Sequence, residues 1–240
     1  MPSPPPVTWK VVYWGPKGAG KTTCLRVLER RAPRARGELA SIVAKPDHGG
    51  CRFELLHLEL SHHGRPGVGL DVFSVPGCPA CVATRGLVLQ RVDAVVFVAD
   101  ADPSRLAANR QAAFELVSAL RAQGRDPAAV PIVVQVNKRE LPQALSTAAL
   151  RDALRPLGAD RQVVESVASL GEGVTPTLRL ITRVLLATEA RRAPLADEAA
   201  DASLPPAPAP APRARPAPPA APVRPRDRGR SGRAPALAGR

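Results

Sequence analysis

The chain has 240 residues and a formal net charge of +13, with 45% hydrophobic but only 3% aromatic residues. That length allows one or two domains, and four cysteines do not suggest a disulfide framework. The longest apolar run, Ala94–Ala99, is too short to cross a bilayer, and Met1–Val7 lacks the features of a signal peptide, so we expect a cytoplasmic protein.

The first predicted element is a β-rich run, Thr8–Trp14, that leads directly into Gly15–Thr22. The latter matches G-x-x-x-x-G-K-[ST], the phosphate-binding P-loop, whose glycines let backbone N–H groups approach phosphate oxygens. Lys21 is expected to reach the β- and γ-phosphates, and the Thr22 hydroxyl to bind Mg²⁺. Thr22–Arg31 follows as an amphipathic helix, so the motif lies between a strand and a helix N-terminus, as its mechanism requires.

Turn residues and hydrophobic periodicity predict the elements that follow. A polar, turn-rich stretch runs to Gly50, after which Arg52–Leu60 and Val68–Val75 form a hairpin around a turn at Ser61–Gly67. Continuous apolar runs indicate buried strands, and leucines at helical spacing indicate helices. In chain order, we expect a strand at 94–99, a helix over Leu106–Leu120 that is capped by Asp102–Pro103, a strand at 131–136, a helix at 146–157, a strand at 162–168 and a helix at 175–189.

Strands that alternate with helices after one hairpin predict an α/β fold. The sheet is expected to be mostly parallel, with helices on both faces. Ligands bind such sheets at the carboxyl ends of the strands. The P-loop follows the first strand and therefore lies at this edge.

The end of the chain has a different composition. Of the 28 prolines, 11 fall between Ser203 and Arg240, with eight arginines, one aspartate and no aromatic residue. Such a stretch cannot bury enough apolar surface to fold. We predict a disordered N-terminus at 1–7, a folded domain at 8–190 and a disordered, Pro/Ala/Arg-rich tail at 191–240. The tail is interpreted as a soluble linker or as a weak, non-specific binder of acidic surfaces.

Short motifs follow three of the predicted strands, at Ser74–Gly77, at Asn137–Glu140 and at Ala168. Together with the P-loop, and in this order, they resemble those of the small GTPase fold. The segments KVVYWGPKGAGKTT, VFSVPG, VDAVVFVAD and VVQVNKRELP are similar to those of the bacterial gliding-motility and cell-polarity GTPases of the MglA type. The resemblance covers about residues 8–190 and excludes the tail.

This resemblance implies a switch protein that binds GTP/GDP with Mg²⁺. Asn137 and Lys138 are expected to brace the base and the P-loop, Glu140 to accept the N–H donors of guanine, and the Ala168 N–H to contact the guanine carbonyl. Glu140 is longer than the family's Asp, so we expect a looser fit to guanine. The Gly77 N–H is expected at the γ-phosphate. The expected nucleotide-binding residues are Gly15, Lys17, Gly18, Ala19, Gly20, Lys21, Thr22, Thr23, Gly77, Asn137, Lys138, Glu140 and Ala168, and Thr22 is also the expected metal ligand.

The catalytic positions depart from the usual small-GTPase pattern. Cys78 stands where a glutamine usually orients the attacking water. Residues 42–60 contain no threonine, and Lys17 occupies a P-loop position that is usually glycine. Ser74 brings no negative charge where most small GTPases have Asp, a departure shared with the MglA type. We therefore expect weak or lost intrinsic hydrolysis and assign no catalytic residue.

One other group of residues suggests different chemistry. Cys78 and Cys81 form a C-x-x-C pair at an expected helix start, and Cys51 and all four histidines lie at nearby sequence positions. A zinc or redox site is conceivable. The second half of a four-ligand pattern is missing, so small, half-buried cysteines are the favoured interpretation.

Two further hypotheses stay open beside the guanine-nucleotide switch. One is a non-catalytic pseudo-GTPase that acts as an interaction module, and the other is an adenine-nucleotide P-loop protein. Turnover separates the switch from the first, and base preference separates it from the second. The family resemblance also implies partners, namely a roadblock-type dimeric activator and effectors in polarity or motility.

Overall fold

The computed structural model describes residues 7–31, 40–43, 52–62, 65–77 and 81–201. The chain divides into one unit of Met1–Glu198 and another of Ala199–Arg240, and all helices and strands except the end of the last helix belong to the first. Residues 1–6 and 202–240, for which we predicted disorder, lie outside the described residues. No helix within the described ranges has both the length and the apolarity that a membrane-spanning segment needs.

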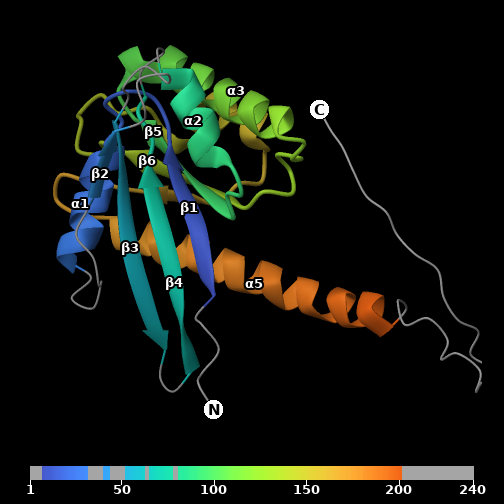
Figure 1. Cartoon of the computed structure of the whole chain (residues 1–240). Helices are drawn as coiled ribbons and strands as arrows, with labels where there is room; N and C mark the ends of the chain where they lie inside the picture. Colours follow the sequence, from blue (N-terminus) through green and yellow to red (C-terminus); the bar gives the residue numbers. More distant parts are fainter. Residues whose placement is uncertain (1–6, 32–39, 44–51, 63–64, 78–80, 202–240) are drawn as a thin grey trace, which may run out of the picture. The chain divides into compact units, whose positions relative to one another are not determined.

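A seven-stranded sheet in the order β2-β3-β4-β1-β5-β6-β7 forms the centre of the first unit (Figure 1). Strands β4, β1, β5, β6 and β7 run parallel, whereas β2, β3 and β4 pair in antiparallel fashion. The mostly parallel α/β sheet predicted from the sequence is confirmed. The strands are β1 (Thr8–Trp14), β2 (Ala40–Val43), β3 (Arg52–His62), β4 (Arg65–Ser74), β5 (Ala94–Asp100), β6 (Ile132–Asn137) and β7 (Val163–Glu165).

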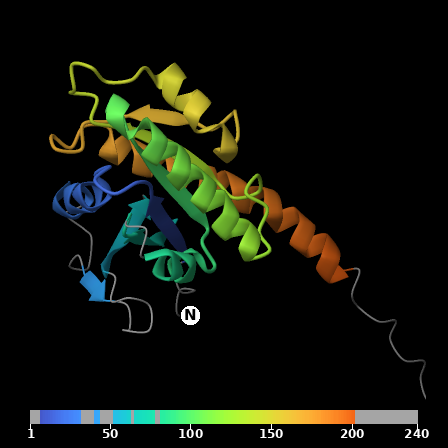
Figure 2. The ribbon, with the colours of Figure 1, turned by 90° about the horizontal axis from the view of Figure 1, so that it is seen from above.

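Helices cover both faces of the sheet, as Figure 2 shows from above. One apolar cluster joins β1, β5 and β6 to α2, α3 and α4 through residues such as Val12, Phe97 and Leu116. The other joins the opposite face to α1 and α5 through residues such as Val11 and Ile181. The helices are α1 (Lys21–Arg31), α2 (Val82–Leu89), α3 (Leu106–Ala122), α4 (Thr147–Ala153) and α5 (Val174–Asp201), with short 3₁₀ turns η3 (Pro103–Arg105) and η4 (Arg155–Leu157).

The alternation of side chains along β1 explains why both layers are needed. Val11 and Tyr13 enter one cluster, while Val12 and Trp14 enter the other. Successive side chains of a strand point to opposite faces, so this strand is buried only when helices cover both sides. All seven residues of β5 are buried for the same reason.

The structure corrects several predicted boundaries. The turn-rich stretch before Gly50 contains β2, and the hairpin turn is shorter than expected because β3 continues to His62 and β4 begins at Arg65. The single helix predicted at 146–157 is divided into α4 and η4, because Pro156 has no N–H to donate within a continuous helix. The strand predicted at 162–168 is β7 alone.

The last helix is longer than predicted. It was expected to end at residue 189, with a disordered tail from 191, but α5 runs to Asp201. The added segment is rich in alanine, with glutamate, leucine and arginine. Apart from Pro194, which also falls in this segment, most of these residues have high helix propensity, which favours the continuation of a helix that has already been nucleated.

Candidate functional site

The P-loop and the later motifs lie at one edge of the sheet, where the parallel strands end. Gly15 follows β1, Val75 follows β4, Ala101 follows β5 and Lys138 follows β6. The antiparallel direction of β3 brings its first residues to this edge too, since Glu54 pairs with Ser74. The sequence-based expectation that these motifs share one edge is confirmed.

Lys21 is the central cation of this edge. Its side chain is buried, and Nζ donates to the backbone oxygens of Gly15 and Pro16, both at 2.8 Å. Burial and then the Arg85 guanidinium lower the pKa of Lys21 to about 8, against a smaller opposing effect of Glu54. Lys21 thus donates to two backbone oxygens at the start of the P-loop, and an anion bound here would stabilise its charged form.

Two glycines are required by close approaches. Gly20 has φ +100°, and a Cβ there would lie 2.3 Å from the Asn137 side-chain nitrogen. A Cβ on Gly77 would lie 2.4 Å from the backbone nitrogen of Lys17. The backbone of Gly77 is therefore packed against the P-loop.

Thr22 makes an unexpected contact. Its hydroxyl donates to the Glu54 carboxylate, with Oγ1 at 3.0 Å from Oε1 and 2.8 Å from Oε2. The sequence analysis missed Glu54 because the strand pattern marks it only as a polar position. The hairpin register was the signal that could have placed it beside Ser74 and the P-loop.

Asn137 ties three segments together. Its Nδ2 donates to the Ala19 oxygen at 2.8 Å, and its Oδ1 accepts from the Ala168 backbone N–H at 2.8 Å and from the Ser166 hydroxyl at 3.1 Å. Asn137 at the end of β6 thus links the P-loop to the segment that follows β7. The Ala168 N–H, expected at the guanine carbonyl, is given to Asn137 in this structure.

Lys138 is fixed by a residue that the sequence analysis did not single out. Its Nζ donates to Asp100 Oδ2 at 2.7 Å, and Asp100 is fully buried. Arg105 lies near the same carboxylate and also donates to the Lys17 oxygen at 2.8 Å. A carboxylate at the end of an otherwise apolar strand was the available signal, because such a residue needs a charged partner.

Glu140 lies at the rim of this arrangement. Its side chain is exposed, and Oε1 accepts from the Ser169 hydroxyl at 3.4 Å. This long contact restrains the carboxylate only weakly. Glu140 is therefore free to reorient toward a donor on a ligand.

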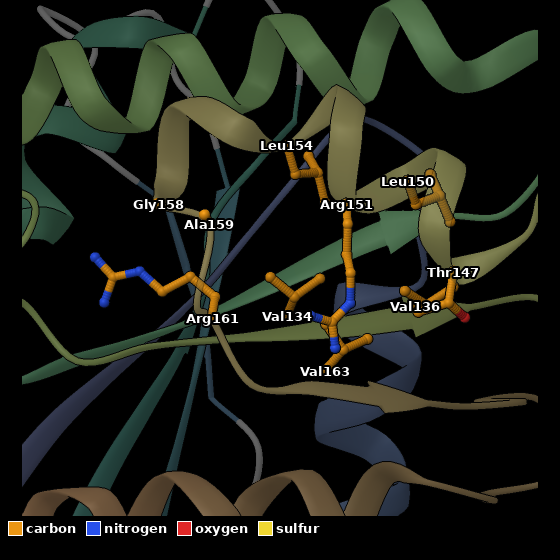
Figure 3. Close-up of a pocket in the computed structure, with 10 residues that line it drawn as sticks. All are labelled: Val134, Val136, Thr147, Leu150, Arg151, Leu154, Gly158, Ala159, Arg161 and Val163. Atoms are coloured by element: carbon orange, nitrogen blue, oxygen red, sulfur yellow. The ribbon is translucent and has the colours of Figure 1, made fainter.

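A cavity of about 310 Å³ lies between the P-loop, Glu54 and the Ser74–Gly77 segment. A second cavity, between β6, β7 and α4, is shown in Figure 3 and measures only about 20 Å³. Its walls include Val134, Leu150 and Leu154, and the Arg161 guanidinium points away from it to three backbone oxygens. The second cavity has room for about one water, whereas the P-loop cavity is large enough for a phosphate group and is lined by Lys17 and Lys21.

No protein-family model matches the chain. The chain is 35% identical over 183 residues to the mutual gliding-motility protein MglA of Myxococcus xanthus (strain DK1622). This matched region covers 75% of the present chain and 91% of the relative. The chain belongs to the MglA family of small GTPases. This match confirms the resemblance that the motifs indicated. It also confirms the general class, a small GTPase of the gliding-motility and polarity type.

The residues at which this MglA-family chain departs from the usual small-GTPase pattern, and its C-x-x-C cysteines, differ in burial. Ser74 is buried beside Glu54, and Lys17 is exposed. Cys78, at the usual position of the water-orienting glutamine, lies outside the described residues. Cys81 is buried before α2 and disulfide-bonded, so its interpretation as a small, half-buried cysteine is wrong. Within the described ranges, no group of three or more histidine, cysteine or acidic side chains is placed to hold a metal ion.

Proposed function

We propose that this MglA-family chain binds GTP and GDP with Mg²⁺ at the edge formed by the P-loop and by the loops after β6 and β7, and acts as a two-state switch. Two hydrogen bonds of the Asn137 side chain support this proposal, because they link Ala19 of the P-loop to Ala168. A ligand that spans both segments would place its phosphate chain at the P-loop and a second group at the loops after β6 and β7. A nucleotide combines the two.

The donor set suits the phosphates and the cation. Lys21 supplies a buried positive charge, and the glycines of the P-loop allow backbone N–H groups to approach oxygen. Mg²⁺ is held in proteins by hydroxyl, carboxylate and phosphate oxygens, and Thr22 and Glu54 place a hydroxyl and a carboxylate together. When bound, the cation would neutralise charge on the β- and γ-phosphate oxygens.

Guanine is the proposed base. The Glu140 carboxylate can accept two N–H donors, which guanine offers and adenine does not offer at the same edge. Lys138 is held over Asp100, where its stem can lie along a purine face. Titration of the purified full chain with fluorescent GDP, GTP and ATP tests this proposal directly. Equal affinity for GTP and ATP would favour the adenine-nucleotide alternative.

Intrinsic hydrolysis is proposed to be weak or lost. Cys78 has no amide to orient water, and residues 42–60 offer no threonine. Single-turnover phosphate release should therefore be slower than the rate on the order of 10⁻⁴ s⁻¹ that is usual for an unassisted small GTPase. A Cys78→Gln, Lys17→Gly double variant should be faster than the wild type. A fast wild type that is slowed by these changes would contradict this part of the proposal.

The partners proposed for this chain are those implied by its family, a roadblock-type dimeric activator and polarity or motility effectors. An activator can supply the catalytic group that the chain lacks. Addition of such an activator to the GTP-loaded protein should then raise phosphate release. If the rate stays unchanged while the complex forms, the pseudo-GTPase interaction module is favoured.

A further inference from the structure

We propose that Arg31, the last residue of α1, is a positioning residue for base recognition, because it fixes the loop after β7 that carries Ala168. The inference rests on the proposed nucleotide function and adds a residue from outside the expected motifs. It is carried by two side-chain hydrogen bonds, by the way the loop closes on itself, and by the contacts of the loop with both ends of α1.

The Arg31 guanidinium bonds to two successive backbone oxygens of this loop. NH1 donates to the Gly171 oxygen at 2.6 Å, and NH2 donates to the Leu170 oxygen at 3.1 Å. A Cβ on Gly171 would lie 2.5 Å from Arg31 NH2, so the guanidinium lies directly against the loop backbone. The donors of an arginine form a rigid, planar fork. The pair of bonds therefore sets the position of both peptide groups.

The loop is a compact unit, so its far end and its near end move together. Val167 and Glu172 are joined by two backbone hydrogen bonds of 3.1 Å. Between them, the Gly171 N–H donates to the Ala168 oxygen, also at 3.1 Å. Because Gly171 is bonded both to Arg31 and to Ala168, a shift of the segment that Arg31 holds is passed on to Ala168.

The same loop carries the contacts proposed for guanine. The Ala168 N–H is the proposed donor to the guanine carbonyl, and the Ser169 hydroxyl donates to the Glu140 carboxylate at 3.4 Å. Adenine has an amino group where guanine has this carbonyl, so a backbone donor at this position favours guanine. The position of the loop should therefore affect the choice of base more than the affinity for the phosphates.

Helix α1 is tied to this loop near both of its ends. Next to its start, Asn137 bonds to Ala19 of the P-loop and to Ala168. The second attachment is made by Arg31, at the other end of the helix and about 15 Å away along its axis. Without this attachment the loop gains conformations that have to be excluded when guanine binds, which costs affinity.

The test measures the Kd of the full chain for GDP, ADP and inorganic triphosphate, by competition against a fluorescent guanine nucleotide. In Arg31→Ala, the Kd for GDP should rise about 5–10-fold, a usual effect for a residue that acts through others. The preference for GDP over ADP should fall by a similar factor. The Kd for inorganic triphosphate, which has no base, should stay unchanged, whereas a residue needed only for folding would weaken the binding of all three ligands.

Two further variants separate the fork of Arg31 from its charge. Arg31→Lys keeps the positive charge without the planar fork, so its preference for GDP should lie between those of the wild type and Arg31→Ala. Arg30→Ala removes a like charge from the same turn, where the guanidinium bonds to the Arg26 oxygen of its own helix. This control should keep the preference of the wild type. Thermal unfolding checks that each variant is folded, and if Arg31→Ala is not, the preference of Arg31→Lys decides.

The wild type and the variants test different claims. An unchanged preference for GDP in folded Arg31→Ala would overturn this inference alone, as would an equal weakening of triphosphate binding or an equal loss in Arg30→Ala. A wild type that binds no nucleotide, or that binds GDP and ADP equally, would overturn the proposed function and this inference with it.

Discussion

The guanidinium of Arg85 lies over the indole ring of Trp14, with its central carbon 5.2 Å from the ring centroid. Arg85 is only 3% exposed, and its NH1 pairs with Glu115 of α3. Trp14 also donates from Nε1 to the Ala112 oxygen at 2.8 Å. The end of β1, helix α2 and helix α3 are therefore held together by one cation and one ring next to the P-loop.

Glu115→Gln should destabilise the fold, because it leaves the buried Arg85 charge without its carboxylate. Breaking a buried pair costs about 3–5 kcal/mol, and since the Glu115 side chain is 28% exposed we expect about 2 kcal/mol. Urea unfolding of the purified protein measures this change. The exposed Arg155–Asp152 pair gives the control: Asp152→Asn should change stability by less than about 0.5 kcal/mol.

The same pair predicts a recovery. In an Arg85→Met, Glu115→Gln double variant, no buried charge is left unpaired, and methionine keeps an apolar contact with Trp14. The double variant should therefore be more stable than Glu115→Gln alone. If the double variant loses as much stability as the two single variants lose together, the charge pair is not what stabilises this region.

Lys21→Met should remove most of the nucleotide affinity. A charge-assisted hydrogen bond contributes about 1.5–3 kcal/mol, and Lys21 is expected to make at least one to each of two phosphates. We expect at least a 100-fold rise in the Kd for fluorescent GDP, on the order of 3 kcal/mol. Thermal unfolding of the free variant serves as the control for folding. Unchanged GDP affinity in a folded variant would contradict the P-loop assignment.

Nucleotide binding should take up protons at mildly alkaline pH. The pKa of Lys21 is about 8 in the free protein, so the amine is only half charged at that pH. Bound phosphates favour the charged form, and about half a proton per GDP should be taken up near pH 8. Uptake should fall toward zero near pH 6.5, roughly 1.5 units below this pKa, because Lys21 is already charged there. Calorimetry in buffers of different ionisation enthalpy measures the uptake.

Arginine gives the matched control for this proton uptake. Its guanidinium stays charged at every accessible pH, so Lys21→Arg should bind GDP more weakly but without the uptake near pH 8. Uptake that persists in this variant would assign the proton to another group.

Glu140→Ala should abolish the preference for GTP over ATP. The carboxylate is exposed and weakly held by Ser169, so its removal should leave stability almost unchanged. Competition between GTP and ATP against a fluorescent nucleotide measures the preference. Glu59→Ala, far along β3, should keep it. A Glu140→Ala variant that still prefers GTP would place guanine recognition on another residue.

The sequence alone was sufficient for the local parts of this site. The P-loop glycines, Lys21 and Thr22 are recognisable because their chemistry depends on spacing within one turn. Strand β5 was predictable because a strand buried on both faces must be apolar throughout. The end of α5 was less predictable, because the helix continues past Pro194, a residue type that usually ends or kinks a helix.

Only the tertiary structure decided which distant residues meet these local motifs. Glu54 reaches Thr22 only once β4 pairs with β1, because this pairing places the β3–β4 hairpin beside the P-loop. Asp100 meets Lys138 because β5 and β6 end side by side. A local motif records short-range geometry along the chain, whereas the partner of a buried charge is chosen by the pairing of whole strands, which is why these contacts appear only once the sheet is assembled.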